Sequence, residues 1–299
     1  MREAVMVLDG FTLTEGMRWH EDRVWFSDLY NHRVCSMAED GSAFRVEGVF
    51  DGIPCGIGWL PDGRLLVALQ ESKLVMRREG DGTLVIHADL SEVSKGWLND
   101  MIVAPDGTAY VGCHGFDINH NEPFVVGPLM KVSIDGWVTV VGEPAHFSNG
   151  ATISGGDLII AESFANRISR YRIEQDGALT GRTDWATFGP MPTAVELDDR
   201  YAQLVVAPDG ISGPDAEGAI WVADFTAQYA IRVLPGGEII DRVGTGDLNC
   251  FCAALGGADG RTLFLCVAPA ELNPEVRKSQ PRGGIMSFRV DVPLGDDHL

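Results

Sequence analysis

Six equivalent positions of a repeated pattern carry small side chains that could do chemistry together: Glu15, Cys55, Asn99, Asn149, Asp209 and Cys252. Each position lies about seven residues before a tight turn, and a short apolar run follows that turn. If the six positions meet at one point, two carboxylates and two amides lie side by side. Like charges held close are unfavourable unless a cation neutralises them or one of them is protonated. The pattern therefore predicts a site for a cation.

Carboxylates combined with amide carbonyls are the oxygen ligands that suit Ca²⁺, Mg²⁺ or Mn²⁺. A plainer interpretation exists for each position alone, because Glu15-Gly16, Asn149-Gly150 and Asp209-Gly210 are all good turn dipeptides. Their common place in the repeat favours the shared site. We interpret Cys55 and Cys252 as small residues that line the same channel.

The elements that would position these residues are short strands separated by turns. Pro61-Asp62-Gly63 precedes the apolar run 65–68, and Pro105-Asp106-Gly107 precedes the run 109–112. Pro208-Asp209-Gly210 looks like a further turn of this kind. The offset of seven residues instead places the turn of the fifth copy at 215–218, which makes Asp209 the site position of that copy. The pattern recurs six times along the chain, and internal repeats with a period of roughly 20–50 residues are typical of propellers and other repeat folds. Six copies therefore indicate a propeller.

We therefore predict an all-β fold, a six-bladed β-propeller with four antiparallel strands per blade. The inner strand of each blade would line a central channel. Outer strands are expected at 44–49, 84–88, 138–141 and 238–243, and an N-terminal strand at 4–8 would join the last blade and close the ring. Residues 1–294 would form one domain, followed by a flexible tail at 295–299.

Two insertions interrupt the repeat, at 114–127 and 268–282. Loops of this length in a compact β domain often act as lids or binding loops. A solvated crossing is the alternative, and the sequence does not decide between them.

The composition limits the classes of partner. The 299 residues carry a net charge of −20, which repels phosphate backbones and anionic lipid, so we expect neither nucleic acid nor membrane as a partner. No secretion signal or membrane-spanning stretch is evident. The six cysteines are then expected to be free thiols and the protein to be cytoplasmic. The sequence does not predict an oligomeric state.

Four short motifs in this order resemble the gluconolactonase family, also called the senescence-marker-protein-30 or regucalcin-like family, over almost the whole chain. They are Thr14-Glu15-Gly16, Leu98-Asn99-Asp100, Phe147-Ser148-Asn149-Gly150, and Pro208-Asp209-Gly210 ahead of Ile220-Trp221-Val222-Ala223. Members of that family are six-bladed propellers with one catalytic divalent metal in the channel.

The resemblance implies a hydrolase that opens a lactone or a related cyclic ester. Glu15, Asn149 and Asp209 would be the metal ligands, and Asp209 would also act as general base on water. Asn99 would lie beside the metal and hold substrate. The bound ion would be one divalent cation, Ca²⁺ in the first place, with Mg²⁺, Mn²⁺ or Zn²⁺ as alternatives.

One position departs from the family pattern. Trp97 stands where sugar lactonases carry an arginine that binds polar groups of the substrate. A large apolar ring favours a less polar lactone or ester. His114 is a further candidate for a substrate contact because it follows the second strand of its blade.

Two other functions remain open from the sequence. Strictosidine-synthase-like propellers share the scaffold and catalyse a condensation with a glutamate instead of a metal, although the four oxygen-bearing positions argue against that activity. A non-catalytic propeller that binds metal or ligand as a regulator or sensor is the third possibility, since fold alone does not fix function.

Overall fold

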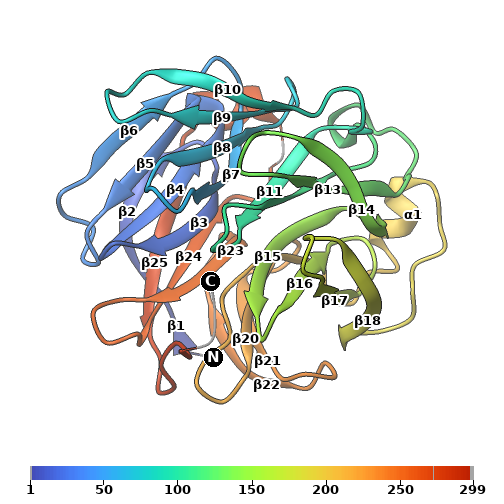
Figure 1. The fold of residues 1–299 in the computed structure, drawn as a ribbon. Coiled ribbons are helices and arrows are strands. Elements are labelled where there is room, and N and C mark those ends of the chain that lie inside the picture. The colour runs from blue at the N-terminus through green and yellow to red at the C-terminus, as the bar shows by residue number, and fades with distance from the viewer. Residues whose placement is uncertain (1, 272, 297–299) are drawn as a thin grey trace.

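The computed structural model describes residues 2–271 and 273–296, and its six β-sheets are arranged around a common axis (Figure 1). In each sheet the innermost strand is followed along the chain by strands that step outward by antiparallel pairing, and the N-terminal strands add to the outer edges of two sheets. The predicted all-β, six-bladed propeller is thus confirmed.

The first three blades each contain four consecutive strands. Blade 1 comprises β3 (Thr14–His20), β4 (Arg23–Asp28), β5 (Arg33–Met37) and β6 (Arg45–Val49). Blade 2 comprises β7 (Pro54–Trp59), β8 (Leu65–Leu69), β9 (Leu74–Arg78) and β10 (Leu84–Asp89). Blade 3 comprises β11 (Leu98–Val103), β12 (Ala109–Cys113), β13 (Gly127–Val132) and β14 (Val138–Ala145).

Blade 4 also contains four consecutive strands, whereas blades 5 and 6 each add a strand from the N-terminal segment. Blade 4 comprises β15 (Ser148–Ser154), β16 (Asp157–Glu162), β17 (Arg167–Ile173) and β18 (Leu179–Thr187). Blade 5 comprises β19 (Pro208–Ile211), β20 (Ile220–Asp224), β21 (Tyr229–Val233), β22 (Ile239–Gly244) and the short β1 (Arg2–Glu3). Blade 6 comprises β23 (Asn249–Gly256), β24 (Thr262–Ala268), β25 (Gly283–Arg289) and β2 (Val5–Phe11).

The N-terminal segment contributes to two blades. As predicted, it closes the ring: β2 pairs antiparallel with β25 in blade 6, where Val5 lies opposite Ser287. In addition β1 runs parallel to β22, and Ala4 donates a backbone hydrogen bond of 2.9 Å to Gly244. Blade 5 therefore has five strands, where four were predicted. The extra strand covers the outer edge of that sheet, which would otherwise leave backbone groups unpaired.

The hydrophobic core lies between neighbouring blades, where their faces pack together. Phe26 and Met37 of blade 1 belong to one buried cluster with Phe264 and Ile285 of blade 6. The expected tail is bonded at its start, since Gly295 donates a backbone hydrogen bond to Pro214, and residues 297–299 lie outside the described part of the chain.

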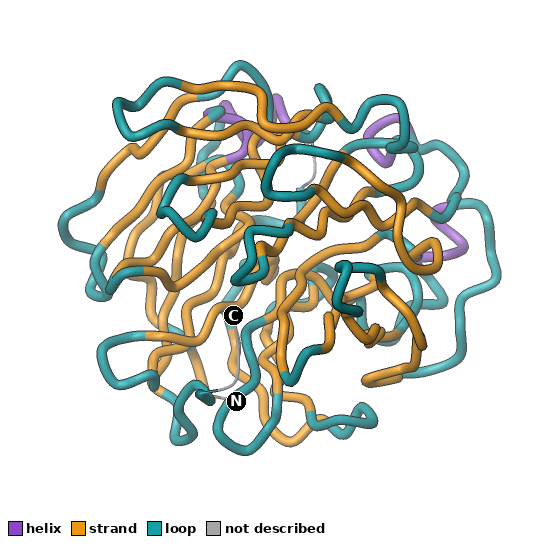
Figure 2. The backbone as a smooth tube through the Cα atoms, viewed as in Figure 1, coloured by secondary structure: helices purple, strands orange, loops and turns teal. Residues whose placement is uncertain are grey.

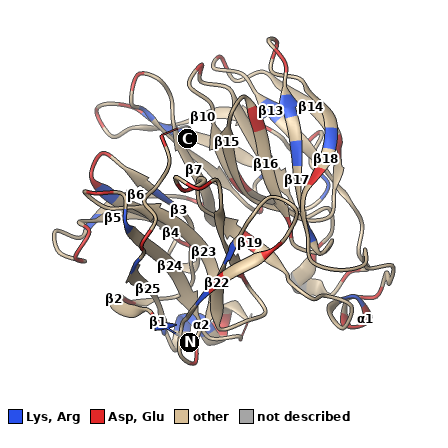
Figure 3. Ribbon diagram, turned by 90° about the horizontal axis from the view of Figure 1, so that it is seen from below, with Lys and Arg blue, Asp and Glu red and all other residues tan. Residues whose placement is uncertain are grey.

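Helical turns occur only in connecting segments of the described chain, as Figure 2 shows. They are η1 (Leu29–Asn31), η2 (Ile118–His120), α1 (Leu197–Tyr201) and α2 (Pro274–Ser279). No helix within residues 2–271 and 273–296 is long and apolar enough to cross a membrane. Many acidic residues lie in the loops between strands, while Lys and Arg occur on outer strands such as β13 and β17 (Figure 3).

Candidate active site

The inner strands share a bulge at the level of the predicted site. In blade 4 Ser148 pairs with Glu162, but the next pair is Ala151 with Ile160, so three steps on one strand oppose two on the other. The same shift occurs in the inner strands of the other blades. A bulge bends the strand and turns the side chain within it. The site positions lie within these irregularities or directly before them, and therefore at one level of the inner strands.

Glycines after the site residues let adjacent inner strands come close. A Cβ on Gly150 would lie 2.5 Å from the backbone nitrogen of Ile211, and one on Gly16 would lie 2.2 Å from the carbonyl oxygen of Cys55. Gly16 also has a φ of +58°, which favours glycine. The dipeptides Glu15-Gly16 and Asn149-Gly150 are thus strand residues at blade contacts, and the turn interpretation was wrong.

One cavity of about 400 Å³ brings together the residues predicted to form the site. Its lining includes the four oxygen-bearing residues Glu15, Asn99, Asn149 and Asp209, and it also includes Cys55, Trp97 and His114. Both insertions border it, because Ile118 of the first and Asn273 and Pro274 of the second line the cavity. Asn273 caps α2 by accepting a hydrogen bond from Glu275 N, and Pro274 begins that helix.

The sixth member of the ring was assigned one residue too late. The bulge of β23 falls between Cys250 and Cys252, so that Phe251 takes the position that corresponds to Asp209. Phe251 lines the cavity. Cys252 instead lies at the level of the glycines, since a Cβ on Gly210 would be 2.3 Å from its sulfur. The predicted place of Cys252 in the ring was therefore wrong.

The two carboxylates of the ring are buried, and within the described residues neither of them forms an ion pair. Asp209 is 3 % exposed, and its Oδ1 atom has no hydrogen-bond partner. Burial raises the pKa of Asp209 well above its usual range, and neighbouring groups that include Cys252 and Asp100 add to the shift. Burial also raises the pKa of Glu15, and the charge of Asp209 adds to it. Such a pair fits a site that is completed by a cation.

The two amides of the ring are fixed by the blades around them. Asn149 donates from Nδ2 to Ser163 Oγ over 3.1 Å, and that hydroxyl donates onward to Pro208 O over 2.8 Å. Asn99 donates from Nδ2 to Ser148 O over 3.0 Å, and its oxygen lies 3.4 Å from Cys55 Sγ. These contacts hold the amides in one orientation beside the carboxylates.

The donor set is mixed, and this matters for the kind of ion it fits. No group of three or more His, Cys, Asp and Glu side chains gathers as a metal site among the described residues. The ring has only two carboxylates, and its remaining oxygens come from amides. This set, together with the unpartnered oxygen of Asp209, fits a hard divalent cation such as Ca²⁺.

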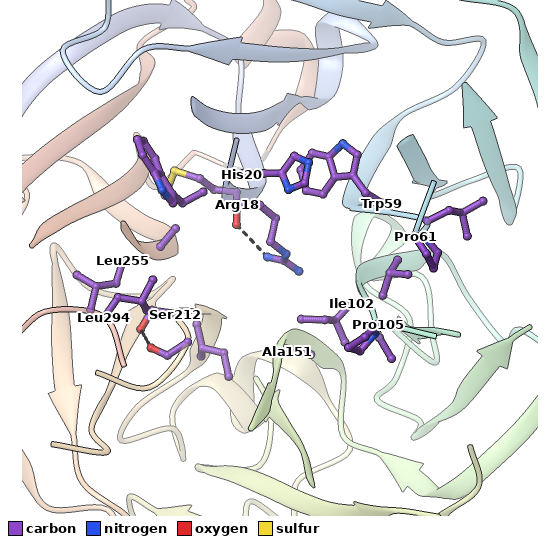
Figure 4. Close-up of a pocket in the computed structure, with 18 residues that line it drawn as sticks. Arg18, His20, Trp59, Pro61, Ile102, Pro105, Ala151, Ser212, Leu255 and Leu294 are labelled. Carbon is purple, nitrogen blue, oxygen red and sulfur yellow. Dashed lines mark hydrogen bonds between the residues drawn. The ribbon is translucent and has the colours of Figure 1, made fainter. Parts of the chain in front are cut away.

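An ion pair that no local pattern in the sequence reveals joins Arg18, which lines a second cavity, to Asp100, the neighbour of Asn99. Arg18 Nη2 lies 2.9 Å from both carboxylate oxygens of Asp100 and 2.8 Å from Met101 O. Figure 4 shows Arg18 pointing into a second cavity of about 390 Å³, which is lined by residues from the far ends of the inner strands. Asp100 is thus neutralised within the protein, in contrast to Glu15 and Asp209.

A third insertion, at 188–207 between blades 4 and 5, was not recognised from the sequence. It contains α1, and Arg200 from this helix places its guanidinium 3.5 Å from the ring centroid of Phe124 in the first insertion. Phe124 N in turn donates to Val195 O over 2.8 Å. The insertions at 114–127 and 188–207 therefore pack against each other, and both contribute to the aromatic cluster that includes Phe147 and Phe225.

Comparisons with known proteins agree with this architecture. Residues 13–269 match the family described as the SMP-30/Gluconolactonase/LRE-like region. A curated relative, 6-deoxy-6-sulfogluconolactonase of Pseudomonas putida, is 22 % identical over 278 residues, covering 91 % of this chain and 89 % of its own.

Two solved structures have the same fold. The calcium-binding protein regucalcin of Agrobacterium tumefaciens superposes with a TM-score of 0.76 at 19 % identity, covering 98 % of this chain and 96 % of its own. A gluconolactonase of Xanthomonas campestris gives a TM-score of 0.71 at 18 % identity, covering 97 % and 89 %. Because the family model spans most of the chain and includes Glu15, Asn99, Asn149 and Asp209, the chain belongs to the SMP-30/gluconolactonase/LRE-like family.

Proposed function

We propose that this protein is a divalent-metal-dependent hydrolase that opens a lactone or a related cyclic ester. The proposal rests mainly on the environment of Asp209. This buried carboxylate lies near Glu15, and its Oδ1 atom has no hydrogen-bond partner in the protein. Membership in the family supports it, as do the lactonase names of the relative from Pseudomonas putida and the structure from Xanthomonas campestris.

Glu15, Asn149 and Asp209 would hold the cation. When bound, the cation would supply Lewis acidity toward the lactone carbonyl and would stabilise the negative charge that develops on its oxygen. Calcium is the first candidate because a protein of the same fold is described as calcium-binding. Magnesium, manganese and zinc remain to be compared.

The protein's own residues supply the proton transfers. Asp209 takes a proton from water as the water oxygen bonds to the carbonyl carbon. The ring C–O bond then breaks, and the proton passes to the departing alkoxide, which gives the open hydroxy acid. Asn99, held by Ser148, lies beside this path and orients the substrate. Trp97 and His114 would contact the rest of the substrate from the cavity wall.

A chelation and restoration experiment tests the proposal. The protein is stripped with a chelator, and acid release from a panel of aliphatic, aromatic and sugar lactones is followed with each divalent ion restored. We expect turnover only with an ion present. Asp209→Asn should lower kcat by about 10²–10⁴-fold, the usual contribution of a general base.

Asp62→Asn is the matched control, since Asp62 is an exposed turn residue that does not line the cavity. It should keep full activity. If the ion-loaded protein binds its cation but opens none of the lactones, the protein is a binding propeller and the proposed activity is wrong. Full turnover by Asp209→Asn would remove Asp209 from the role of base.

A further inference from the structure

We infer that the cavity selects lactones that carry an aromatic ring over lactones that carry several hydroxyl groups. This inference rests on the proposed function and specifies its substrate class. The ring of carboxylates and amides occupies only one part of the cavity, where the ester group would react. The remaining wall must accommodate the substituents of the lactone.

That wall is mostly apolar, and aromatic rings form a large part of it. Trp97 precedes β11, Phe147 precedes β15, Phe225 follows β20 and Phe251 lies on β23, so three neighbouring blades and blade 6 each contribute a ring to the lining. Among the described lining residues there is no Lys or Arg. Aromatic faces offer burial and stacking to a flat apolar group, but no hydrogen bonds to a hydroxyl group.

His114 continues the aromatic wall instead of adding charge to it. Its ring stacks on Phe147 with centroids 4.2 Å apart and an angle of 11° between the planes, and Trp97 stacks at 6.4 Å. Burial lowers the pKa of His114 to about 3, so the imidazole is neutral at physiological pH. Its Nδ1 atom is buried and has no hydrogen-bond partner.

The arginine behind this wall is engaged through two of its nitrogens, while its Nη1 atom is buried without a hydrogen-bond partner. Arg277 lies with its guanidinium 5.1 Å from the ring centroid of Phe251 and bonds to the carbonyl oxygens of Pro269 and Glu271, and it does not line the cavity. The name of the Pseudomonas putida relative specifies a sulfo group on its lactone. The described lining of this cavity has no cationic side chain to pair with such a group.

The physical consequence is a preference. A polyhydroxylated lactone would lose water from each hydroxyl group on entering, and the polar partners outside the ring are few: Tyr30, Gln70, His114 and Asn273. Hydroxyl groups without new partners are costly to bury. An aryl group instead gains from leaving water and from stacking. A cavity of about 400 Å³ accommodates a lactone with one aryl substituent.

The test uses three δ-lactones with the ion-loaded full-length protein: δ-valerolactone, its phenyl-substituted derivative and glucono-δ-lactone. Each kcat/KM is divided by the rate constant for hydroxide-catalysed opening, which removes differences in intrinsic reactivity. We expect the phenyl derivative to exceed glucono-δ-lactone by about 100-fold or more, in the range that pocket complementarity supplies.

A variant connects the preference to the wall. Trp97→Ala should reduce the ratio of kcat/KM for the phenyl derivative over δ-valerolactone by about 10-fold. Trp137→Ala is the matched control, because Trp137 is 78 % exposed and distant from the lining, and it should leave that ratio unchanged. A second measurement does not depend on hydrolysis: 2-phenyltetrahydropyran, which lacks the carbonyl, should bind the wild type more tightly than Trp97→Ala in calorimetry.

The outcomes separate this inference from the proposed function. Opening of glucono-δ-lactone at an equal or higher corrected rate overturns the inference and leaves the lactonase activity in place. If no lactone is opened, the proposed function is wrong. Calorimetry then decides about the wall: binding of the ether that weakens in Trp97→Ala supports an aromatic subsite, and equal or absent binding contradicts it.

Discussion

Glu162 and Asp209 lie on neighbouring blades, and both are carboxylates with almost no exposure to solvent, yet their surroundings are opposite. Glu162 accepts hydrogen bonds from Arg167 at 2.8 and 2.9 Å, from His146 N at 2.8 Å and from the hydroxyl of Ser169. Burial alone would raise its pKa, but the bonds from His146 and Arg167 outweigh burial and lower the pKa to about 2. Asp209 has an unpartnered oxygen and a raised pKa.

This difference shows that the fold is able to balance a buried carboxylate and does so in blade 4. At the channel it leaves two carboxylates unbalanced. A buried charge without a partner is destabilising, so the proposed metal site of Glu15 and Asp209 would cost stability in the absence of its cation. Glu162 supports the structure of its blade, whereas Asp209 is available for chemistry.

The largest effect on stability is expected at Glu162, the carboxylate whose charge is balanced within blade 4. Glu162→Gln removes one member of a buried ion pair and leaves Arg167 without its partner, so the free energy of unfolding should fall by about 3–5 kcal/mol. Urea denaturation measures the change. Turnover per folded molecule should persist, and the control Glu92→Gln at an exposed position should behave as wild type. A stability within 1 kcal/mol of wild type would contradict the assigned role.

Acid should reveal the same contrast. The pKa of Glu162 is lowered from its ordinary 4.5 to about 2. Its contribution to the free energy of unfolding is therefore fully present above about pH 4.5 and is lost as the pH falls toward 2. The shift corresponds to about 3 kcal/mol. In chelator, Glu15 and Asp209 act in the opposite direction, because their raised pKa values favour the folded state as pH falls from neutrality.

The unfolding free energy of the ion-free wild type should therefore rise as pH falls from 7 and then decline below about pH 4.5. Glu162→Gln should lack most of that decline. Urea midpoints measured between pH 7 and 2.5 check both the rise and the decline of the unfolding free energy. If the wild type and Glu162→Gln decline in parallel below pH 4.5, Glu162 is not the cause of the decline.

Ion binding should restore stability on the unbalanced side. An ion at 100 times its Kd should raise the unfolding free energy of the wild type by about 2.7 kcal/mol. Glu15→Gln removes one carboxylate of the site, so the same ion concentration should give a much smaller increase. Thermal melts with and without ion measure both. An equal increase in the two proteins would place the ion elsewhere.

The smallest effect concerns the orientation of an amide. Ser163 accepts from Asn149 and donates to Pro208. Ser163→Ala frees the Asn149 side chain to rotate, and the Kd of the ion should rise by about 10-fold, as is common when a contact behind a metal ligand is removed. Ser169→Ala, which removes a bond to Glu162, should lower stability and leave the Kd unchanged. Calorimetric titration separates the two.

Much of the fold was predictable because its signals are local. The turn triplets at 61–63 and 105–107 and the apolar runs after them mark strand pairs without any knowledge of distant contacts. The fixed offset of seven residues then placed Asp209 at the site rather than in a turn, and the cavity contains it. The roles of Glu15, Asn149 and Asp209 at a metal remain predictions.

What was missed depends on pairing over long distances. The assignment of Cys252 instead of Phe251 was wrong because a bulge is defined only by the register with β24. The pair Arg18–Asp100 joins residues 82 positions apart, and no local pattern marks it. The segment 188–207 contains a helix of only five residues, which is too short to give an amphipathic signal.

The two-blade attachment of the N-terminal segment has a consequence for the order of folding. β2 must wait for β25, which is made some 280 residues later, so the ring stays open until nearly the whole chain has left the ribosome. Contacts of such sequence separation are slow to form. The closing step also completes the wall between blades 1 and 6 that contains Leu13 and Phe251. The cavity therefore forms only at the end of folding, when the ring of six blades closes, because no single blade contains it.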